Sequence, residues 1–295
     1  MRIAITGANG LLGHGLAQWF GRNHEVTPLT RDDADITSPD AILRVVAAAR
    51  PDVVIHAAAT PDMDLCETNP SLCHAVNVAG TRNVADAARS CGAIFAFISS
   101  DAIFDGRKAE PYTETDEPNP VTIYARSKVE GEKIAAAAAE HFIFRVPVLF
   151  GPGKGNFVSK GLDALRAGQP CVGPTDQVGG ALYTLDAGQS LEQVIVSGRF
   201  GLYHISNSGF CSRYELLGKA AMYAGLDPRH ISPRTRAQID RPAPRLPWMG
   251  MDMLALDGIG VPRPRPWQEA LADYIEGLPE GLNPEVRMMR RGDGR

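Results

Sequence analysis

The stretch "TGANGLLG", residues 6–13, directly follows the run of residues 2–5 near the start of the chain. Three glycines fall at positions 7, 10 and 13. A glycine-rich turn between a strand and a helix lets the backbone approach a pyrophosphate and points the first N–H groups of the helix toward it. Glycines also serve tight packing of a helix on a strand, so the spacing alone supports both interpretations. The place of the stretch, between a first strand and a first helix, favours a dinucleotide site.

The first half of the chain alternates short β-like runs with stretches of helical periodicity. The predicted strands are residues 2–6, 25–29, 53–57 and 93–99, and the predicted helices are residues 11–22, 39–50 and 81–91. Such an alternation indicates a parallel sheet covered by helices on both faces. We therefore expect an α/β protein built on a Rossmann-type, doubly wound parallel sheet.

The regular pattern ends after an apolar, β-like run at residues 142–150, which is closed by Gly151-Pro152-Gly153. Proline-rich stretches at 241–248 and 261–267 predict loops because proline lacks the backbone donor that a helix needs, while residues 213–224 and 267–276 predict helices. We expect an NAD(P)-binding domain at 1–150 and a smaller C-terminal substrate-binding lobe at 151–277. Part of that lobe is expected to return to the first domain, and residues 278–295 to form a flexible tail.

Composition excludes several classes of protein. The 295 residues carry a formal net charge of −4, with Lys and Arg scattered until the last ten residues, so a nucleic-acid surface is not expected. No apolar run reaches the roughly 18 residues of a membrane span and no signal-peptide pattern is present, which predicts a cytoplasmic protein. The 5 cysteines lack C-x-x-C spacing and the 7 histidines lack ligand spacing, so reduced thiols and no metal are expected.

Further residues stand in a fixed order along the predicted elements. These are Asp35-Ile36 after the second strand, Ala57-Ala58-Ala59 after the third, Asn77 in "VNVAGT", Ser99-Ser100, and Tyr124-Ala125-Arg126-Ser127-Lys128. A Y-x-x-x-K match alone is common. Together with the glycine stretch, the ordered set resembles the extended branch of the short-chain dehydrogenase/reductase superfamily.

This resemblance implies a dinucleotide cofactor, with Asp35 and Ile36 against the adenine and the alanine segment beside the nicotinamide. The implied cofactor-binding residues are Gly7, Asn9, Gly10, Leu11, Leu12, Arg31, Asp35, Ile36, Ala57, Ala58, Ala59, Asn77, Tyr124, Lys128 and Val146. At the ribose 2′ position, the second strand ends in Leu29-Thr30-Arg31, and Arg31 favours NADP(H) over NAD(H). Asp32 and Asp33, which follow directly, would favour NAD(H).

The resemblance also implies the catalytic residues Ser100, Tyr124 and Lys128. Side chains four residues apart share one face of a helix, so Lys128 is expected beside Tyr124. An ammonium group and a cationic nicotinamide lower the pKa of a phenol, which is about 10 in the free amino acid. Tyr124 would then give a proton to a carbonyl oxygen that Ser100 holds. Each residue alone would fit an ordinary structural role, and only their order favours catalysis.

The reaction is narrowed by the residues that follow Ser100. Dehydratases of the extended branch have an Asp-Glu pair there, whereas this chain has Asp101 and then Ala102. Four stretches resemble the dTDP-4-dehydrorhamnose reductases and their relatives: "SSDAIFDG" (99–106), "PYTETD" (111–116), "YARSKVEGEK" (124–133) and "FRVPVLFGPGKGNFV" (144–158). This similarity implies NADPH-dependent reduction of the keto group of a nucleotide-linked deoxysugar and allows a homodimer. The implied substrate-binding residues are Ser100, Asp101, Ala102, Asn156 and Arg241.

Three departures from that family concern its specificity. Ala102 replaces a large aromatic residue, Gly180-Ala181-Leu182 replaces a Pro-Thr pair after Asp176-Gln177, and no Asn-Ser follows Arg241-Pro242. They leave the hydride chemistry intact and put the rhamnose precursor itself in doubt. Two alternatives also stay open. One is a non-catalytic, dinucleotide-binding partner protein like the regulatory β subunit of methionine adenosyltransferase, and the other is an epimerase that retains NAD.

Overall fold

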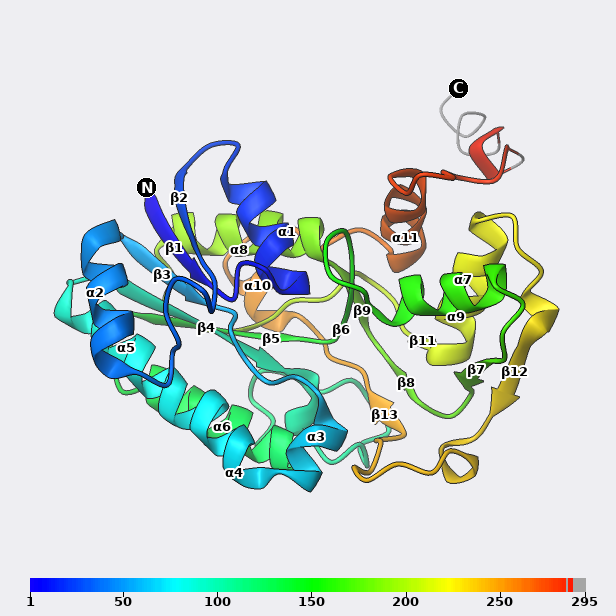
Figure 1. The fold of residues 1–295 in the computed structure, drawn as a ribbon, viewed down its shortest axis with the longest axis horizontal. Coiled ribbons are helices and arrows are strands. Elements are labelled where there is room, and N and C mark those ends of the chain that lie inside the picture. The colour runs from blue at the N-terminus through cyan, green and yellow to red at the C-terminus, as the bar shows by residue number, and fades with distance from the viewer. Residues whose placement is uncertain (285, 289–295) are drawn as a thin grey trace.

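The structure is a computed structural model that describes residues 1–284 and 286–288. Its centre is a parallel sheet of six strands in the order β10-β5-β4-β3-β1-β2 (Figure 1). The strands are β1 (Arg2–Thr6), β2 (Glu25–Leu29), β3 (Val53–His56), β4 (Ile94–Ser100), β5 (His141–Val146) and β10 (Gly201–His204). The chain moves outward from β1 to β2 and then resumes on the other side of β1 with β3. This doubly wound topology confirms the predicted α/β fold and places a switch point between β1 and β3.

Helices cover both faces of this sheet. One face carries α1 (Leu11–Phe20), α8 (Thr184–Ser197) and α10 (Leu254–Gly258), and the other carries α2 (Pro39–Ala49), α5 (Thr81–Ser90) and α6 (Ile123–Ala135). Each face has its own apolar core, formed with the side chains that point to that side of the strands. Because α8, β10 and α10 follow residue 150, the second half of the chain contributes a strand and two helices to the first domain.

Short elements connect β3 to the catalytic region. They are α3 (Met63–Thr68), α4 (Pro70–His74), the π-helical turn η1 (Ala75–Gly80), and, after β4, the 3₁₀ turn η2 (Asp101–Ile103). Asp62 caps α3 by accepting hydrogen bonds from the backbone N–H groups of Asp64 and Leu65. These turns surround the carboxyl ends of β3 and β4.

The second lobe is smaller and has its own core. Its helices are α7 (Phe157–Arg166), α9 (Arg213–Tyr223) and α11 (Trp267–Glu276), with the 3₁₀ turns η3 (Pro228–His230) and η4 (Arg236–Gln238). Its short strands are β6 (Val148–Phe150), β7 (Cys171–Pro174), β8 (Val178–Gly179), β9 (Ala181–Tyr183), β11 (Cys211–Ser212), β12 (Ile231–Arg234) and β13 (Trp248–Met249). Strand β6 pairs with β9, β7 pairs with β12, and β11, β8 and β13 form a three-stranded sheet.

Two elements of the structure differ from what local sequence patterns favour. The strand expected at 142–150 is split at Pro147, which has no N–H for the ladder, so β5 joins the large sheet and β6 pairs in the second lobe. Helix α6 ends at Ala135, although residues 136–139 include further alanines that favour a helix. Because β5 starts at His141, residues 136–140 must turn the chain, and this tertiary requirement overrides the helix propensity of alanine.

The expected flexible tail at 278–295 is partly packed. Leu282 is buried, and Leu278 and Val286 contact the core of the second lobe, so their apolar side chains hold this part of the chain in place. Residues 285 and 289–295 of that tail lie outside the described residues. Among residues 1–284 and 286–288, no helix has the length and apolar character needed to cross a membrane.

Candidate active site

The glycine-rich stretch forms a tight turn from β1 into α1. Gly7 has a φ of +71°, and a Cβ atom there would lie 2.7 Å from the Cα of Ala58, so a larger residue fits neither the conformation nor the space. A Cβ at Gly13 would lie 2.1 Å from the carbonyl oxygen of Gly7. Gly10 is the N-cap of α1 and supplies no side-chain cap. The first N–H groups of α1 therefore fit a pyrophosphate.

A buried histidine joins the ends of β1 and β3 behind this turn. The Nδ1 atom of His56 lies 2.7 Å from the hydroxyl of Thr6, and its Nε2 atom lies 3.0 Å from the hydroxyl of Thr81. Burial lowers the pKa of His56 to about 3, and the charge of Lys128 acts in the same direction. The imidazole is thus neutral at pH 7. As a neutral bridge it connects the end of β1 to the start of α5.

Arg31 follows β2 and is available to a ligand. Its side chain is 85% exposed, and its guanidinium makes one 3.3 Å contact with the carboxylate of Asp35. The carboxylate of Asp33 accepts hydrogen bonds from the N–H and the hydroxyl of Thr30, which lower its pKa. This aspartate is therefore engaged with the end of β2. Arg31 presents the charge that suits a 2′-phosphate.

The three predicted catalytic residues lie together at the carboxyl edge of the sheet. Ser100 ends β4, and its hydroxyl donates to the carboxylate of Asp101 at 3.2 Å and accepts from the N–H of Ala102 at 3.1 Å. Tyr124 and Lys128 lie on α6, whose N-terminus Thr122 caps. The hydroxyl of Ser100 acts to lower the pKa of the Tyr124 phenol. The amine of Lys128 lies 6.0 Å from the centre of the Tyr124 ring.

The electrostatics of the phenol correct one expectation. Burial raises the pKa of Tyr124 above its usual value, and Asp101 acts in the same direction. The amine of Lys128 donates to the carbonyl oxygen of Ile98 at 2.9 Å. Burial also lowers the pKa of Lys128 to about 8. A neutral phenol fits the role of proton donor in a reduction.

Asn77 holds the parts of this site together. From the π-helical turn η1, its carbonyl oxygen accepts from the N–H of Thr60, and its amide donates to the carbonyl of Thr60 and to the hydroxyl of Ser127. Ser127 lies between the tyrosine and the lysine on α6. Asn77 thus ties the segment after β3 to helix α6.

A buried ion pair fixes α6 against the sheet. Both carboxylate oxygens of Glu132 accept from the guanidinium of Arg145 on β5, each at 2.9 Å. The hydroxyl of Ser99 donates to the same carboxylate at 2.5 Å. A charge-assisted, bidentate pair of this kind allows little movement of α6 along the sheet. The phenol of Tyr124 is therefore held at a defined place relative to the strand ends.

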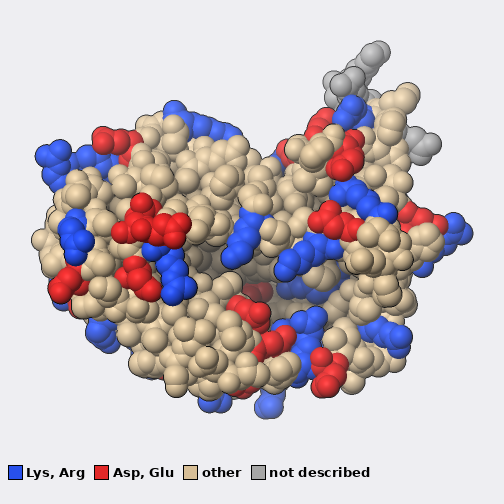
Figure 2. All heavy atoms as spheres, viewed as in Figure 1, with Lys and Arg blue, Asp and Glu red and all other residues tan. Residues whose placement is uncertain are grey.

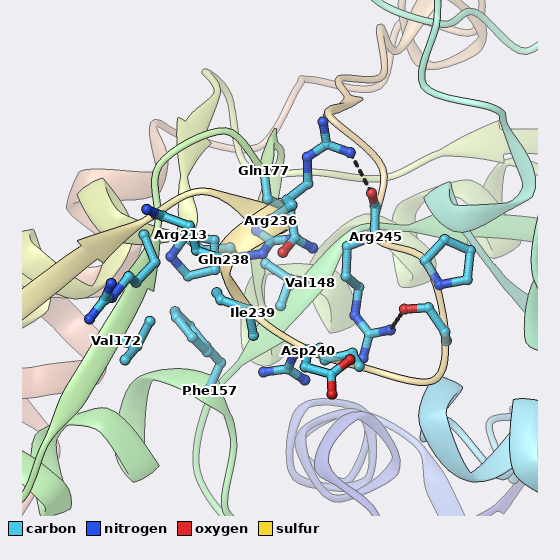
Figure 3. Close-up of a pocket in the computed structure, with 15 residues that line it drawn as sticks. Val148, Phe157, Val172, Gln177, Arg213, Arg236, Gln238, Ile239, Asp240 and Arg245 are labelled. Carbon is cyan, nitrogen blue, oxygen red and sulfur yellow. Dashed lines mark hydrogen bonds between the residues drawn. The ribbon is translucent and has the colours of Figure 1, made fainter.

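A large pocket lies in the second lobe, on the side that faces the sheet. Figure 2 shows a hollow between the two parts of the molecule, with Lys and Arg gathered along its edge. The pocket has a volume of about 830 Å³. Its lining includes Val148, Phe157, Gln177, Asp240 and five arginines, Arg213, Arg234, Arg236, Arg241 and Arg245. In Figure 3 the Phe157 ring and the Arg213, Arg236 and Arg245 side chains surround the same space. An apolar wall with several cations suits a nucleoside diphosphate.

Two buried charges link this pocket to the catalytic residues. Asp101 is 5% exposed, and burial raises its pKa to about 6, while the charge of Arg213 opposes that rise. One oxygen of Asp101 has no hydrogen-bond partner among the described residues. The guanidinium of Arg213, at the start of α9, makes one long hydrogen bond to the carbonyl oxygen of Gly180 at 3.5 Å. Its remaining donors are available to a ligand in the pocket.

The structure places the other predicted substrate-binding residues in three different settings. Arg241 lines the pocket, and Ala102 is a buried part of the turn η2. Asn156 instead caps α7, where its carbonyl oxygen accepts from Val158 and Ser159 and its amide donates to Gly151 and Tyr274. These four hydrogen bonds occupy both acceptor positions of the side-chain oxygen and both hydrogens of the side-chain nitrogen. We therefore correct the expected substrate role of Asn156 to helix capping.

The remaining predicted cofactor residues lie at the same edge of the sheet. Ala57, Ala58 and Ala59 follow β3, Val146 ends β5, and Ile36 is buried against α5 near Gly80. Asn9, Leu11 and Leu12 belong to the turn and the first turn of α1. Because the carboxyl ends of parallel strands meet at one edge, segments that are far apart in sequence converge there.

Sequence reasoning missed most of the arginines of the pocket. Arg213 is the first residue of an amphipathic helix, and Arg245 belongs to a proline-rich stretch interpreted only as a surface loop. It also missed the buried Cys73, whose thiol donates to the hydroxyl of Ser127 on α6 at 3.6 Å. The one available signal was the density of arginine between residues 229 and 245.

A doubly wound sheet, a glycine turn at its switch point, and a Ser-Tyr-Lys set at the same edge define an extended short-chain dehydrogenase/reductase. The family model described as RmlD substrate binding domain matches residues 1–279. The chain belongs to this family.

Individual relatives and solved structures support the same family. The dTDP-4-dehydrorhamnose reductase of Mycolicibacterium smegmatis is 35% identical over 282 residues, which cover 94% of this chain and 86% of that protein. The dTDP-4-dehydrorhamnose reductase structure from Clostridium acetobutylicum has a TM-score of 0.88 at 34% identity, covering 93% and 98% of the two chains. The corresponding Bacillus anthracis structure, in complex with NADP, has a TM-score of 0.89 at 30% identity, covering 92% and 98%.

Proposed function

We propose that this protein reduces the keto group of a nucleotide-linked deoxysugar with NADPH. The observation that carries the proposal is the convergence of Ser100, Tyr124 and Lys128 beside the glycine turn, next to a pocket lined by five arginines. The relatives named dTDP-4-dehydrorhamnose reductase support the same reaction class. The fold, the catalytic set and the charge of the pocket all suit a substrate of this class.

The residues of the predicted dinucleotide site suit NADPH. Gly7 leaves room for the backbone to approach the pyrophosphate, the start of α1 offers N–H donors, and Arg31 offers a cation to the 2′-phosphate. When bound, NADPH supplies the hydride that reduces the ketone. Lys128 is placed to hold the ribose of the nicotinamide, once its amine leaves the carbonyl oxygen of Ile98.

Each catalytic side chain then has one task. Ser100 hydrogen-bonds the carbonyl oxygen of the substrate and orients it. Tyr124 donates the phenolic proton to the same oxygen, so that an alcohol forms instead of an alkoxide. The charge of Lys128 stabilises the phenolate that remains. In the protein alone the hydroxyl of Ser100 donates to the carboxylate of Asp101 at 3.2 Å, so it turns away from that carboxylate to donate to the substrate oxygen.

We further propose dTDP-4-dehydrorhamnose as the first substrate to test, because relatives that carry this name cover most of the chain. Ala102, which replaces an aromatic residue of the family in the turn after Ser100, has a smaller side chain. A sugar that differs from the rhamnose precursor in size or configuration is therefore the second substrate to test. The dTDP-linked nucleotide and the 4-keto group are common to both.

The proposal is tested by mixing purified protein, NADPH and dTDP-4-dehydrorhamnose and following NADPH absorbance at 340 nm. We expect one NADPH consumed for each sugar reduced. Tightly bound NAD that survives purification, with no consumption of added NADPH, would instead support an epimerase. Binding of NADPH without reduction of any keto sugar, together with copurification of a larger enzyme, would support a regulatory subunit.

A further inference from the structure

A proline-rich segment of the second lobe crosses the edge of the arginine pocket. We call residues 240–247 the strap. Three of its eight residues are prolines, so few backbone donors are available to hold it. At one end, the guanidinium of Arg236 donates to the carbonyl oxygen of Arg245 at 2.7 Å (Figure 3), and the carbonyl oxygen of Pro247 accepts from Val178 at 2.9 Å. Both contacts lie within the second lobe.

The other anchor of the strap is a single carboxylate of the first domain. Asp64 on α3 accepts from the N–H of Ala243 at 3.1 Å and from both terminal nitrogens of Arg245 at 3.0 and 2.9 Å. Arg241 adds one weaker contact at 3.4 Å. The Asp64 side chain is 27% exposed and that of Arg245 is 17% exposed, so this is a largely shielded, bidentate pair. Asp64 thus connects the two parts of the molecule.

Helix α3 relates the strap to the catalytic helix. Three residues after Asp64, the carboxylate of Glu67 accepts from the N–H of Ile123 at 3.1 Å, at the start of α6. Tyr124 is the next residue. The strap and the phenol are therefore both fixed to one short helix, and the distance between the arginines of the pocket and the reacting carbonyl depends on it.

We propose that Asp64 is a positioning residue for substrate binding, which holds the strap so that Arg241 and Arg245 face the phosphates of the substrate. The proposal rests on the proposed function, which supplies a nucleotide-linked substrate. Arg241, whose side chain is 47% exposed and makes a single long contact with Asp64, exchanges that carboxylate for a phosphate oxygen. Arg245 keeps its two bonds to Asp64 and remains the fixed point of the strap.

Two effects of removing the Asp64 charge oppose each other. Loss of a negative charge near the pocket would tighten the binding of an anion, whereas release of the strap would weaken it by leaving two arginines to be ordered by the ligand. At about 0.5 M salt the screening length falls to about 4 Å, which suppresses the long-range charge effect and leaves the ordering effect. Immobilising two long side chains anew corresponds to about a tenfold loss of affinity.

The experiment measures binding of dTDP to NADPH-saturated protein by calorimetry in 0.5 M KCl. We expect Asp64→Asn to weaken dTDP binding about tenfold, to raise the KM for the keto sugar by a similar factor, and to change kcat by less than about twofold. NADPH binding should be unchanged. Asp86→Asn is the matched control, because Asp86 pairs with Arg89 on the exposed face of α5 and loses the same charge away from the pocket.

A double-mutant cycle tests whether Asp64 acts through the strap. Arg245→Gln should weaken dTDP binding, and Asp64→Asn should then add less than it does in the wild-type background. Full additivity would overturn the inference, as would an Asp64→Asn protein that binds dTDP as tightly as the wild type. A wild-type protein that binds no dTDP also overturns it. Binding of dTDP without reduction of a keto sugar would refute the proposed function alone, and the Asp64 comparison would still decide this inference.

Discussion

At the scale of single residues, the phenol of Tyr124 carries the chemistry. In the protein alone it is neutral, because burial and the nearby Asp101 raise its pKa. The hydroxyl of Ser100, the residue that also holds the carbonyl oxygen in the proposed reaction, acts in the opposite direction on this pKa. A neutral donor at this place gives the ketone a proton at the moment when charge develops on oxygen.

Replacing Tyr124 by Phe removes this proton and little else. We expect kcat to fall about 10²- to 10⁴-fold, the usual contribution of a positioned acid, while NADPH affinity measured by fluorescence stays within about threefold of wild type. Retained turnover in the Phe variant would remove Tyr124 from the mechanism. Ser100→Ala is the companion variant and should lose less, because it removes orientation of the carbonyl and leaves the acid in place.

Arg31 decides between the two dinucleotides. Its 85% exposed side chain has one weak partner, whereas Asp33 is bound to Thr30. We expect Arg31→Ala to weaken NADPH binding about tenfold and NADH binding hardly at all, because only NADPH carries the 2′-phosphate. Titration of both dinucleotides by fluorescence checks this. Arg89→Ala, a surface arginine paired with Asp86, is the control, and an unchanged preference in the Arg31 variant would contradict the assignment.

At the scale of elements, helix α6 depends on one buried pair for its place on the sheet. Glu132→Gln keeps the shape of the side chain but leaves Arg145 as an unpaired buried charge. We expect the free energy of unfolding in urea to fall by about 3–5 kcal/mol. Asp163→Asn, which breaks a partly exposed pair with Arg166, should cost less than about 1 kcal/mol. Equal losses in the two variants would show that the Glu132 pair has no special role.

The elements also show how much of the fold and of the site can be predicted from the sequence. The strands near residues 2–6, 25–29 and 94–100 and the helices after them follow local apolar patterns, and the structure has them within a few residues. The split at Pro147 and the end of α6 at Ala135 depend on how β5 and β6 pair with distant strands. A local sequence pattern carries no information about that pairing. In the site, Ser100, Tyr124 and Lys128 carry an ordered motif. Arg213 lines the pocket, and Asp64 contacts two of its arginines, only because of tertiary packing, and neither residue belongs to a sequence motif.

At the scale of the whole molecule, stability depends on pH through the central sheet. His56 on β3 and His204 on β10 are buried and neutral, and burial lowers the pKa of each to about 3. Since an unfolded histidine has a pKa near 6.5, the unfolded state binds more protons below that pH, and stability is lost as the pH falls from about 6.5 toward 3. Asp101, whose pKa is raised to about 6, acts in the opposite direction below pH 6.

We expect a net loss of about 2–3 kcal/mol between pH 7 and pH 5, from about 2 kcal/mol for each histidine less about 1 kcal/mol for Asp101. Urea unfolding at the two pH values measures it. In His56→Gln the same pH change should cost about 2 kcal/mol less than in wild type, whatever the variant loses at pH 7. A pH dependence identical to wild type would mean that His56 is not the titrating group.

The central claim is that this chain transfers a hydride to the carbonyl carbon of a nucleotide-linked sugar. NADPH carrying deuterium at the transferable C4 position, mixed with dTDP-4-dehydrorhamnose and the purified protein, tests it in one step. We predict one deuterium on the former carbonyl carbon of the product, seen by mass spectrometry and NMR, with an equal amount of NADP⁺ formed. A product without deuterium, or a sugar recovered unchanged beside intact NADPH, would contradict the account.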